Sequence, residues 1–377
     1  MRRTTKASIG TGGTFRHRTM AGVLGAPIAL PLLLSACSSG ANTSQSASQS
    51  AASGESVQLS TGGGPEVNVP KDGMKIGLFM AAKTNAYQSE MIKGAEEAAA
   101  QNGATVTVYD ANYDPKKQMD QIQNAIQQGS INAVILHPTS GDLLCNLASQ
   151  KLPEQGIPVI VVGTTVCGKD IGHGDALAAP GIVAFAGSNA ADTFINGVLD
   201  NTAKLNPGDH TIALVEGPQE LAYTKAFDTL AEQWQTANPG QNIAYTVYTD
   251  YTTPDAQAKT QSLLKAHPDI DLIISVYSPD ITRGVINALQ AEGKAGTVPV
   301  SDIGGSEYAY EQIKAGNIQS TVPLFPYNLT FNSVQALGQA AQSGQAPPRF
   351  IDDSTVGSAA QPVALTVDTL SQYQPQY

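Results

Sequence analysis

The feature that most constrains the fold of this chain is an alternation of apolar runs and amphipathic segments that begins at residue 75. The runs 75–80 and 133–136 are apolar at nearly every position, and the amphipathic segment 88–101 lies between them. A strand of this kind is buried on both faces, as strands are in a parallel sheet covered by helices. The alternation therefore predicts an α/β fold.

The alternation occurs twice, which predicts two lobes. Further strands are expected at 105–109, 157–162, 211–215, 244–248, 271–275 and 298–300. In both halves, at 131–143 and at 270–281, a buried strand ends in a polar, proline-containing turn that begins a helix. We therefore expect two similar doubly wound parallel-sheet lobes that face each other.

The first 36 residues have the organisation of a secretory signal peptide. Five basic residues precede an apolar segment at about 21–34, and no acidic residue occurs before Glu55. The apolar segment is interrupted by Pro27 and Pro31, and it is shorter than the roughly 20 residues that a membrane-spanning helix needs. The pair Arg2-Arg3 leaves both the general secretory and the twin-arginine export routes open.

The tetrapeptide Leu34-Ser35-Ala36-Cys37 at the end of this segment resembles the bacterial lipobox. In a lipobox the cysteine becomes the lipidated first residue of the mature protein; the alternative is an ordinary signal peptide with an incidental cysteine. Residues 37–73 are predicted to be a disordered tether, because Ser, Gly, Ala and Gln dominate the start of this segment. We expect an exported protein, periplasmic or at the cell surface, anchored by lipid to the outer face of the cytoplasmic membrane.

The charge and the motif content exclude several classes of function. The formal net charge is −11, and removal of the basic residues of the signal takes it to about −16, which argues against nucleic acids and anionic membrane surfaces as partners. The chain has no phosphate-binding loop, nucleophile elbow, zinc-binding spacing or dinucleotide fingerprint, so we expect neither an enzyme nor a cofactor. The segment 110–114 resembles the start of a calcium loop, but Pro115 and Gln121 replace the required glycine and glutamate, so no metal is expected.

Several segments resemble one known family in their order along the chain. They are Lys83-Thr-Asn-Ala-Tyr-Gln-Ser-Glu90, which continues to residue 96, and the segments 109–118, 135–142, 156–160, 186–189, 289–294 and 313–317. These segments are similar to type I periplasmic binding proteins of the ribose-binding class, the substrate-binding components of sugar ABC transporters. The resemblance covers residues 74–370.

The resemblance implies a monomer whose two lobes close around a small ligand by hinge motion and then engage a membrane permease. The chain would cross between the lobes near 186–188, 323–325 and 358–362. The N-terminal lobe would hold 74–186 with 325–360, and the C-terminal lobe 187–324 with 361–377. The alternative function is a receptor of the same fold that presents autoinducer-2 or a sugar to a signalling partner.

Candidate ligand-binding residues follow from the rule that ligands of open α/β sheets lie beyond the carboxyl ends of the strands. Tyr87 is the strongest candidate, because an aromatic face covers the C–H surface of a sugar and the hydroxyl can form a hydrogen bond. Packing at a lobe edge is the alternative for Tyr87, and an N-cap role is the alternative for Asp280. The predicted set is Lys83, Asn85, Tyr87, Gln88, His137, Thr164, Asn189, Tyr223, Tyr277, Ser278, Asp280, Asp302 and Phe325.

Several positions differ from the ribose-binding pattern. Gly163 and Thr164 lie where ribose binders carry an aspartate–arginine pair, and Leu221 lies about where they carry another arginine. Ser278, Gly304 and Leu324 replace an asparagine, an aspartate and a glutamine. These differences predict a ligand other than ribose, namely another sugar, a polyol or a related polyhydroxylated molecule.

One of the three cysteines is expected to carry the lipid anchor, and the other two remain as a possible disulfide pair. With Cys37 assigned to lipid, Cys145 and Cys167 remain in an exported protein, where a disulfide can persist. Autoinducer-2-binding relatives have a cysteine pair at matching places, so the resemblance implies a disulfide between the helix after the third strand and the loop after the fourth. Two free buried thiols are the alternative.

Overall fold

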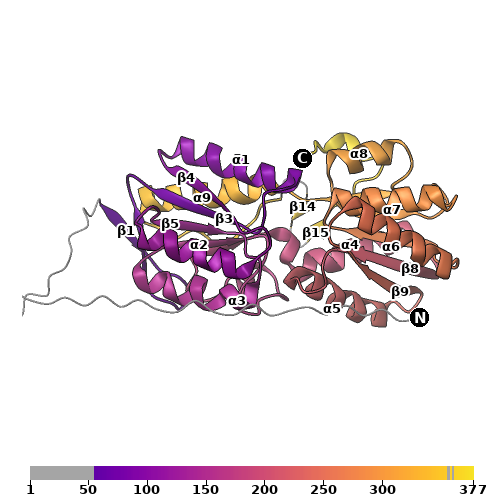
Figure 1. The fold of residues 1–377 in the computed structure, drawn as a ribbon, viewed down its shortest axis with the longest axis horizontal. Coiled ribbons are helices and arrows are strands. Elements are labelled where there is room, and N and C mark those ends of the chain that lie inside the picture. Colours follow the sequence, from indigo (N-terminus) through magenta and orange to yellow (C-terminus); the bar gives the residue numbers. More distant parts are fainter. Residues whose placement is uncertain (1–54, 355–356, 359–360) are drawn as a thin grey trace, which may run out of the picture. The chain divides into compact units, whose positions relative to one another are not determined.

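The computed structural model describes residues 55–354, 357–358 and 361–377 (Figure 1). The predicted signal peptide and the predicted lipidation site Cys37 lie outside these residues, so both stay predictions. Within the described residues, no helix is both long enough and apolar enough to cross a bilayer.

The first sheet consists of six parallel strands in the order β13-β7-β6-β5-β3-β4. Their bounds are β3 Lys75–Met80, β4 Thr105–Asp110, β5 Ala133–Leu136, β6 Val159–Val162, β7 Ala184–Ala186 and β13 Phe350–Ile351. The apolar runs predicted as strands are confirmed here. The strand expected from residue 157 begins at Val159, because the backbone N–H of Ile157 donates to Leu152 in the preceding turn.

Helices cover both faces of the first sheet. They are α1 Ala86–Gln101, α2 Pro115–Gln127, α3 Gly141–Asn146, which continues as a π turn at Leu147–Lys151, and α9 Pro326–Ser343. Helices α1 and α9 lie side by side (Figure 1), and Met91 and Leu337 pack with Ile76 on one face. On the other face, Ile122 of α2 and Leu144 of α3 pack with Phe79 and neighbouring strand residues.

The second sheet consists of five parallel strands in the order β12-β11-β10-β8-β9. The strands are β8 His210–Glu216, β9 Gln241–Tyr248, β10 Leu272–Val276, β11 Val300–Gly304 and β12 Ser320–Pro323. The helices are α4 Asp192–Leu205, α5 Ala222–Ala237, α6 Thr253–Ala266, α7 Pro279–Ala291 and α8 Glu307–Lys314. The apolar stripe of α5, which includes Phe227 and Trp234, is buried against this sheet with α4, and α6, α7 and α8 cover the other face.

The chain passes between the two sheets more than once. It leaves the first sheet after β7 and returns after β12 through α9 and β13. It then forms the short antiparallel pair β14 Gly357–Ser358 and β15 Gln361–Pro362, after which Leu365 pairs with Thr321 of β12. The final turn is a 3-10 helix at Leu370–Gln372. The lobe boundaries given above stay a prediction.

The structure corrects the expected extent of the tether. Within the predicted tether, β1 Ser56–Leu59 pairs with β2 Val67–Pro70 in an antiparallel hairpin. Leu59, Val67 and Val69 are buried with the residues of α9. These apolar side chains give this segment a face to bury, which the Ser- and Gly-rich segment before it lacks.

Arg349 joins this hairpin region to the first sheet. Its half-buried guanidinium donates to the backbone carbonyls of Thr61, Ala178, Ala179 and Ile182. Burial lowers the pKa of Arg349, and the charge of Asp175 partly offsets that effect. The guanidinium therefore supplies hydrogen-bond donors to backbone carbonyls that lie outside the strands of the sheet.

We predict that Arg349→Met lowers the free energy of unfolding by about 2 kcal/mol, because the partly buried carbonyls of Ala178 and Ile182 lose their donor. The carbonyls of Thr61 and Ala179 each keep a backbone N–H donor. Urea unfolding followed by circular dichroism measures the change. Arg283→Met is the control: Arg283 is exposed and stacks on Tyr308, so its loss should change stability by no more than about 0.5 kcal/mol. Equal unfolding midpoints for Arg349→Met and the unmodified protein would contradict the prediction.

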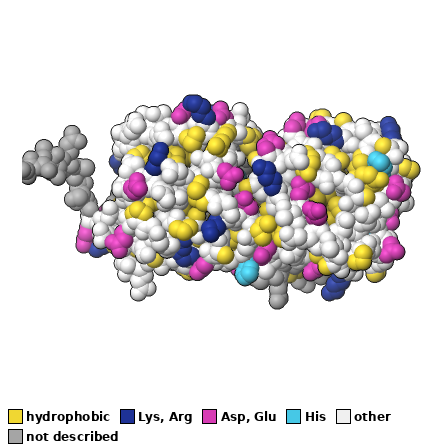
Figure 2. Space-filling view, turned by 90° about the horizontal axis from the view of Figure 1, so that it is seen from below, with side chains coloured by type: hydrophobic (Ala, Val, Ile, Leu, Met, Phe, Trp, Pro, Cys, Tyr) yellow, Lys and Arg dark blue, Asp and Glu magenta, His cyan; other side chains and the backbone are white. Residues whose placement is uncertain are grey.

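Charged side chains of both signs are interspersed on the face of the molecule that Figure 2 shows. Most ion pairs among the described residues have at least one exposed member, and in some both are exposed, such as Lys116 with Asp120 along α2 and Lys71 with Glu55 beside the hairpin. Exposed pairs of this kind contribute little to stability. The fold is held mainly by its apolar layers.

Candidate ligand-binding cavity

A cavity of about 80 Å³ opens where the carboxyl ends of strands from both sheets meet. This volume is several times the space that one water molecule needs. The position is where open α/β sheets bind ligands. The lining residues are Ala81, Asn85, Tyr87, Gln88, Tyr113, His137, Pro138, Thr139, Gly163, Thr164, Asn189, Leu221, Tyr223, Tyr251, Tyr277, Ser278, Pro279 and Leu324.

Five tyrosines dominate the lining, and three of them have an unusual backbone. Tyr113, Tyr251 and Tyr277 follow β4, β9 and β10, with φ values of 59°, 65° and 66°. A left-handed conformation is uncommon outside glycine, and such residues cluster at functional sites. The backbone of each strand end thus turns so that an aromatic ring reaches the cavity.

The tyrosine rings also support one another. Tyr223 and Tyr277 pack edge to face with their centroids 5.3 Å apart, and the hydroxyls of Tyr223 and Tyr251 share a hydrogen bond. From the first lobe, the ring of Tyr87 packs edge to face on Tyr377 at 5.5 Å. Tyr377 is fixed in turn, because its hydroxyl donates to the carbonyl of Gly304 at 2.7 Å. These contacts hold the rings in place before any ligand enters.

Several polar side chains of the lining bond to the protein itself. The side-chain oxygen of Gln88 accepts from the backbone of Thr84, and its amide nitrogen donates to the Tyr113 hydroxyl at 3.1 Å. Asn85 is the N-cap of α1, and Ser278 is the N-cap of α7. These bonds satisfy the free N–H groups of the first helical turns and fix the loops that border the cavity.

His137 is a neutral group in the lining. Burial lowers its pKa to about 4, and its Nδ1 atom is shielded from solvent without a partner among the described residues. The ring lies against Gly163, where φ is 71° and a Cβ atom would come within 3.3 Å of it. A neutral imidazole can both donate and accept a hydrogen bond.

The low pKa of His137 predicts a pH-dependent stability. In the unfolded chain a histidine takes up its proton near pH 6.5, whereas the buried ring does so only near pH 4. Acidification from pH 7 to pH 5 should therefore cost the unmodified protein about 1 to 2 kcal/mol more than the His137→Gln variant. Urea unfolding at both pH values tests this, and parallel losses in the two proteins would contradict it.

No Asp, Glu, Lys or Arg side chain is part of the lining of this cavity. Two carboxyl groups outside the lining, Glu216 and Asp353, are buried. Burial, and next the charge of Asp228, raises the pKa of Glu216 well above its usual value. Burial also raises the pKa of Asp353 to about 6, although its carboxylate accepts from the backbone N–H of Ser188 at 2.8 Å. Among the described residues, no cluster of three His, Cys, Asp or Glu side chains could hold a metal ion.

Comparison with known proteins assigns this chain to a family. A family model described as "periplasmic binding protein domain" matches residues 76–346, which is well over half of the chain. This chain belongs to that family.

Relatives and solved structures agree with this assignment. The ribose import binding protein of Bacillus subtilis is 25% identical over 255 residues, which cover 67% of this chain and 76% of that protein. The ribose import binding protein of Escherichia coli is 22% identical, and the match covers 73% of this chain and 87% of that protein. The Caulobacter myo-inositol binding protein has a TM-score of 0.67 at 22% identity, covering 79% of this chain and 95% of its own. At that identity the likeness shows the fold alone: two α/β lobes with parallel sheets.

The structure brings nine predicted residues of this periplasmic binding protein into the cavity lining. They are Asn85, Tyr87, Gln88, His137, Thr164, Asn189, Tyr223, Tyr277 and Ser278. Their contact with a ligand stays a prediction.

Four predicted residues lie outside the lining. Lys83 is exposed, and Phe325 is buried against Tyr373. Asp280 accepts from the hydroxyl of Thr253, and it is not the N-cap of α7, because Ser278 has that role. Asp302 lies inside β11 rather than after it, and its carboxylate accepts from the hydroxyls of Thr282 and Thr321.

Two of the cavity tyrosines are not among the residues predicted from the sequence. Tyr113 and Tyr251 follow the strands β4 and β9, as Tyr277 follows β10. The rule of strand ends applied to those two turns would have found both.

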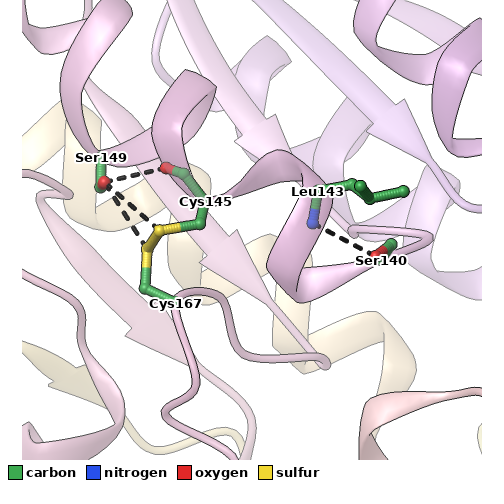
Figure 3. Close-up of a disulfide and its surroundings, with 5 residues drawn as sticks. All are labelled: Ser140, Leu143, Cys145, Ser149 and Cys167. Carbon is green, nitrogen blue, oxygen red and sulfur yellow. Dashed lines mark hydrogen bonds between the residues drawn. A yellow bond between two sulfur atoms is a disulfide. The ribbon is translucent and has the colours of Figure 1, made fainter.

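Cys145 and Cys167 are joined in a disulfide in the structure (Figure 3). It ties α3 to the loop after β6, which carries Thr164 into the cavity. The hydroxyl of Ser149 lies 3.6 Å from the sulfur of Cys167 and donates to the carbonyl of Cys145. The start of α3 is capped separately, since Ser140 accepts from the backbone N–H of Leu143.

Proposed function

We propose that this protein is the substrate-binding component of an ABC importer and that it captures a neutral sugar or polyol in the tyrosine-lined cavity. The observation that carries the proposal is the composition of the lining: five aromatic rings, uncharged hydrogen-bonding groups and no ionised side chain. Aromatic faces cover the C–H surface of a sugar ring, and their hydroxyls bond its edge. The relatives named above are binding proteins, which supports binding rather than catalysis, and import rather than signalling.

Capture would work by closure of the two lobes on the ligand. The chain connects the two sheets at several separate places, after β7, after β12 and after β13. Connections of this kind serve as hinges in binding proteins, where a few residues absorb the backbone rotation. In this proposal the ligand completes contacts between the lobes, and a membrane permease recognises the closed form.

A thermal-shift screen followed by calorimetric titration tests the proposal. The panel contains neutral pentoses, hexoses, their deoxy and O-methyl forms, and inositols. A ligand that binds only the folded state raises the unfolding temperature, and 1,000-fold excess over the dissociation constant adds about 4 kcal/mol. A panel without any stabilising compound would contradict the proposal.

We also propose that Cys37 carries a lipid anchor. The support is the lipobox-like tetrapeptide at residues 34–37, which follows an apolar segment and precedes a Ser-rich one. The Cys37→Ser variant should leave the membrane fraction and retain its ligand affinity, because the cavity is built from residues 81–324. Cell fractionation with immunoblotting measures this, with Cys145→Ser as the control that should remain in the membrane. Retention of Cys37→Ser in the membrane would contradict the anchor.

A further inference from the structure

Residues 373–377 are attached to the second sheet through two tyrosine hydroxyls. The hydroxyl of Tyr373 donates to the carbonyl of Gly305 at 2.8 Å, and the hydroxyl of Tyr377 donates to the carbonyl of Gly304 at 2.7 Å. A Cβ atom on either glycine would lie only 3.0 Å from the hydroxyl oxygen of Tyr373 or 3.1 Å from that of Tyr377. The two glycines therefore leave the room that these hydroxyls need.

The same segment supplies hydrogen-bond acceptors to the first turn of one helix on each sheet. The backbone N–H of Glu307, the first residue of α8, donates to the backbone oxygen of Tyr377 at 2.6 Å. The backbone N–H of Tyr327, in the first turn of α9, donates to the side-chain oxygen of Gln376 at 3.1 Å. First-turn N–H groups have no acceptor within their own helix, and the N-cap residue of α9, Phe325, supplies none from its side chain. Gln376 thus caps a helix that packs on the first sheet.

Gln376 is also bonded to the segments through which the chain passes between the sheets. Its amide nitrogen donates to the side-chain oxygen of Asn328 at 3.1 Å, and the amide nitrogen of Asn328 donates to the carbonyl of Asp353 at 3.0 Å. The buried carboxylate of Asp353 accepts in turn from the backbone N–H of Ser188. Ser188 follows β7, Asn328 follows β12 and Asp353 follows β13. This chain of hydrogen bonds therefore includes a residue from each of the three connections.

The ring of Tyr377 supports the cavity from behind. It packs edge to face on Tyr87, which belongs to α1 on the first sheet and lines the cavity. The hydroxyl of Tyr377 is fixed to Gly304 at the end of β11 in the second sheet. A rotation of one lobe against the other would separate the two rings. The position of the Tyr87 ring is therefore coupled to the arrangement of the lobes.

We propose that residues 373–377 form a strap that holds the two lobes in the arrangement that creates the cavity, and that Tyr377 positions the ring of Tyr87 for ligand binding. The strap goes beyond the proposed function, because it acts on the lobes whether or not a ligand is present. The positioning role rests on the proposed function. If the segment only capped α8 and α9, its loss would change the starts of these helices and leave the cavity closed.

Chemical labelling of the ligand-free protein tests the strap. Diethyl pyrocarbonate modifies neutral imidazoles, and mass spectrometry gives the labelling rate of His137 in the cavity lining relative to that of the exposed His173. In the variant Gln376→Ala/Tyr377→Ala we expect this relative rate to rise about threefold or more, because the lobes are apart in a larger share of the molecules. The matched control is Gln374→Ala, since Gln374 is exposed in the same segment, and its relative rate should not change.

An unchanged relative rate in the folded double variant would overturn the strap. Gln376→Ala alone removes only two side-chain hydrogen bonds and should give a smaller increase. If the double variant does not fold, this single variant decides, and labelling of His137 at the rate of the Gln374→Ala control would then overturn the strap.

Calorimetric titration with the sugars and inositols of the panel tests the positioning role. Tyr377→Ala should weaken the binding of each compound that binds by about tenfold, the upper end of what an edge-to-face aromatic pair contributes. Tyr377→Phe keeps the ring against Tyr87 and should restore the affinity to within about threefold, since the carbonyl of Gly304 still accepts from the backbone N–H of Leu324. Unchanged affinity in a folded Tyr377→Ala variant would overturn the positioning role. A panel in which no compound binds the unmodified protein would overturn the proposed function, and the labelling rates would still decide on the strap.

Discussion

The Tyr87→Ala variant should bind its ligand about a hundredfold more weakly than the unmodified protein, a loss of about 3 kcal/mol. Tyr87 lines the cavity from the first turn of α1, and its ring is held edge to face by Tyr377. Burial, and next the charge of Asp353, raises its pKa, so the hydroxyl remains a donor. Removal of the ring takes away both the face that covers the ligand and this donor.

Two further variants separate these contributions. Tyr87→Phe keeps the ring and loses the hydroxyl, so its affinity should fall by about tenfold, close to the net value of one hydrogen bond. Tyr308→Ala removes a half-buried tyrosine outside the cavity and should leave the affinity unchanged. Calorimetric titration of all three gives the comparison. Affinity within twofold of the unmodified protein in a folded Tyr87→Ala variant would show that this ring does not contact the ligand.

Loss of the disulfide should have the largest effect on stability. The bond joins Cys145 to Cys167 across a sequence separation of 22 residues, and closure of a loop of this length stabilises the folded state by about 3 kcal/mol. We expect the free energy of unfolding of the double variant Cys145→Ser/Cys167→Ser to be lower by that amount. Urea unfolding measures the change. Its ligand affinity should also fall, because the loop that carries Thr164 is no longer tied to α3.

Reduction of the unmodified protein provides the matched control. With a reductant present, the unmodified protein should unfold at the same urea concentration as the double variant. The reductant should not change the urea concentration at which the double variant unfolds. Identical unfolding of the oxidised protein and the double variant would show that the two cysteines are not bonded in solution.

Much of the fold could be predicted because its strands are buried on both faces. The runs around Ile76, Val134 and Ile273 are apolar at nearly every position, and each one is an interior strand of its sheet. The prediction was weakest where a strand contains polar residues. Strand β11 was expected at 298–300, but it spans Val300–Gly304, since the hydroxyls of Thr282 and Thr321 satisfy the buried Asp302.

The cavity was harder to predict because partners decide what a polar residue does. The carboxylates of Asp302 and Asp280 could bind the hydroxyls of a sugar, but they accept hydrogen bonds from threonine hydroxyls of the protein instead. Tyr113 and Tyr251 reach the cavity through a left-handed backbone, which sequence patterns do not reveal for a residue other than glycine. Position at a strand end proved a better guide than residue type.

A crystal structure of this protein with the tightest compound of the panel would show directly whether the tyrosine-lined cavity is the binding site. We expect the ligand ring in the cavity, in contact with Tyr87 from one lobe and Tyr277 from the other, with His137 within hydrogen-bonding distance of its edge. A ligand bound only elsewhere, for example in the groove between the C-terminal half of α9 and residues 345–352, would show that this cavity is not the binding site.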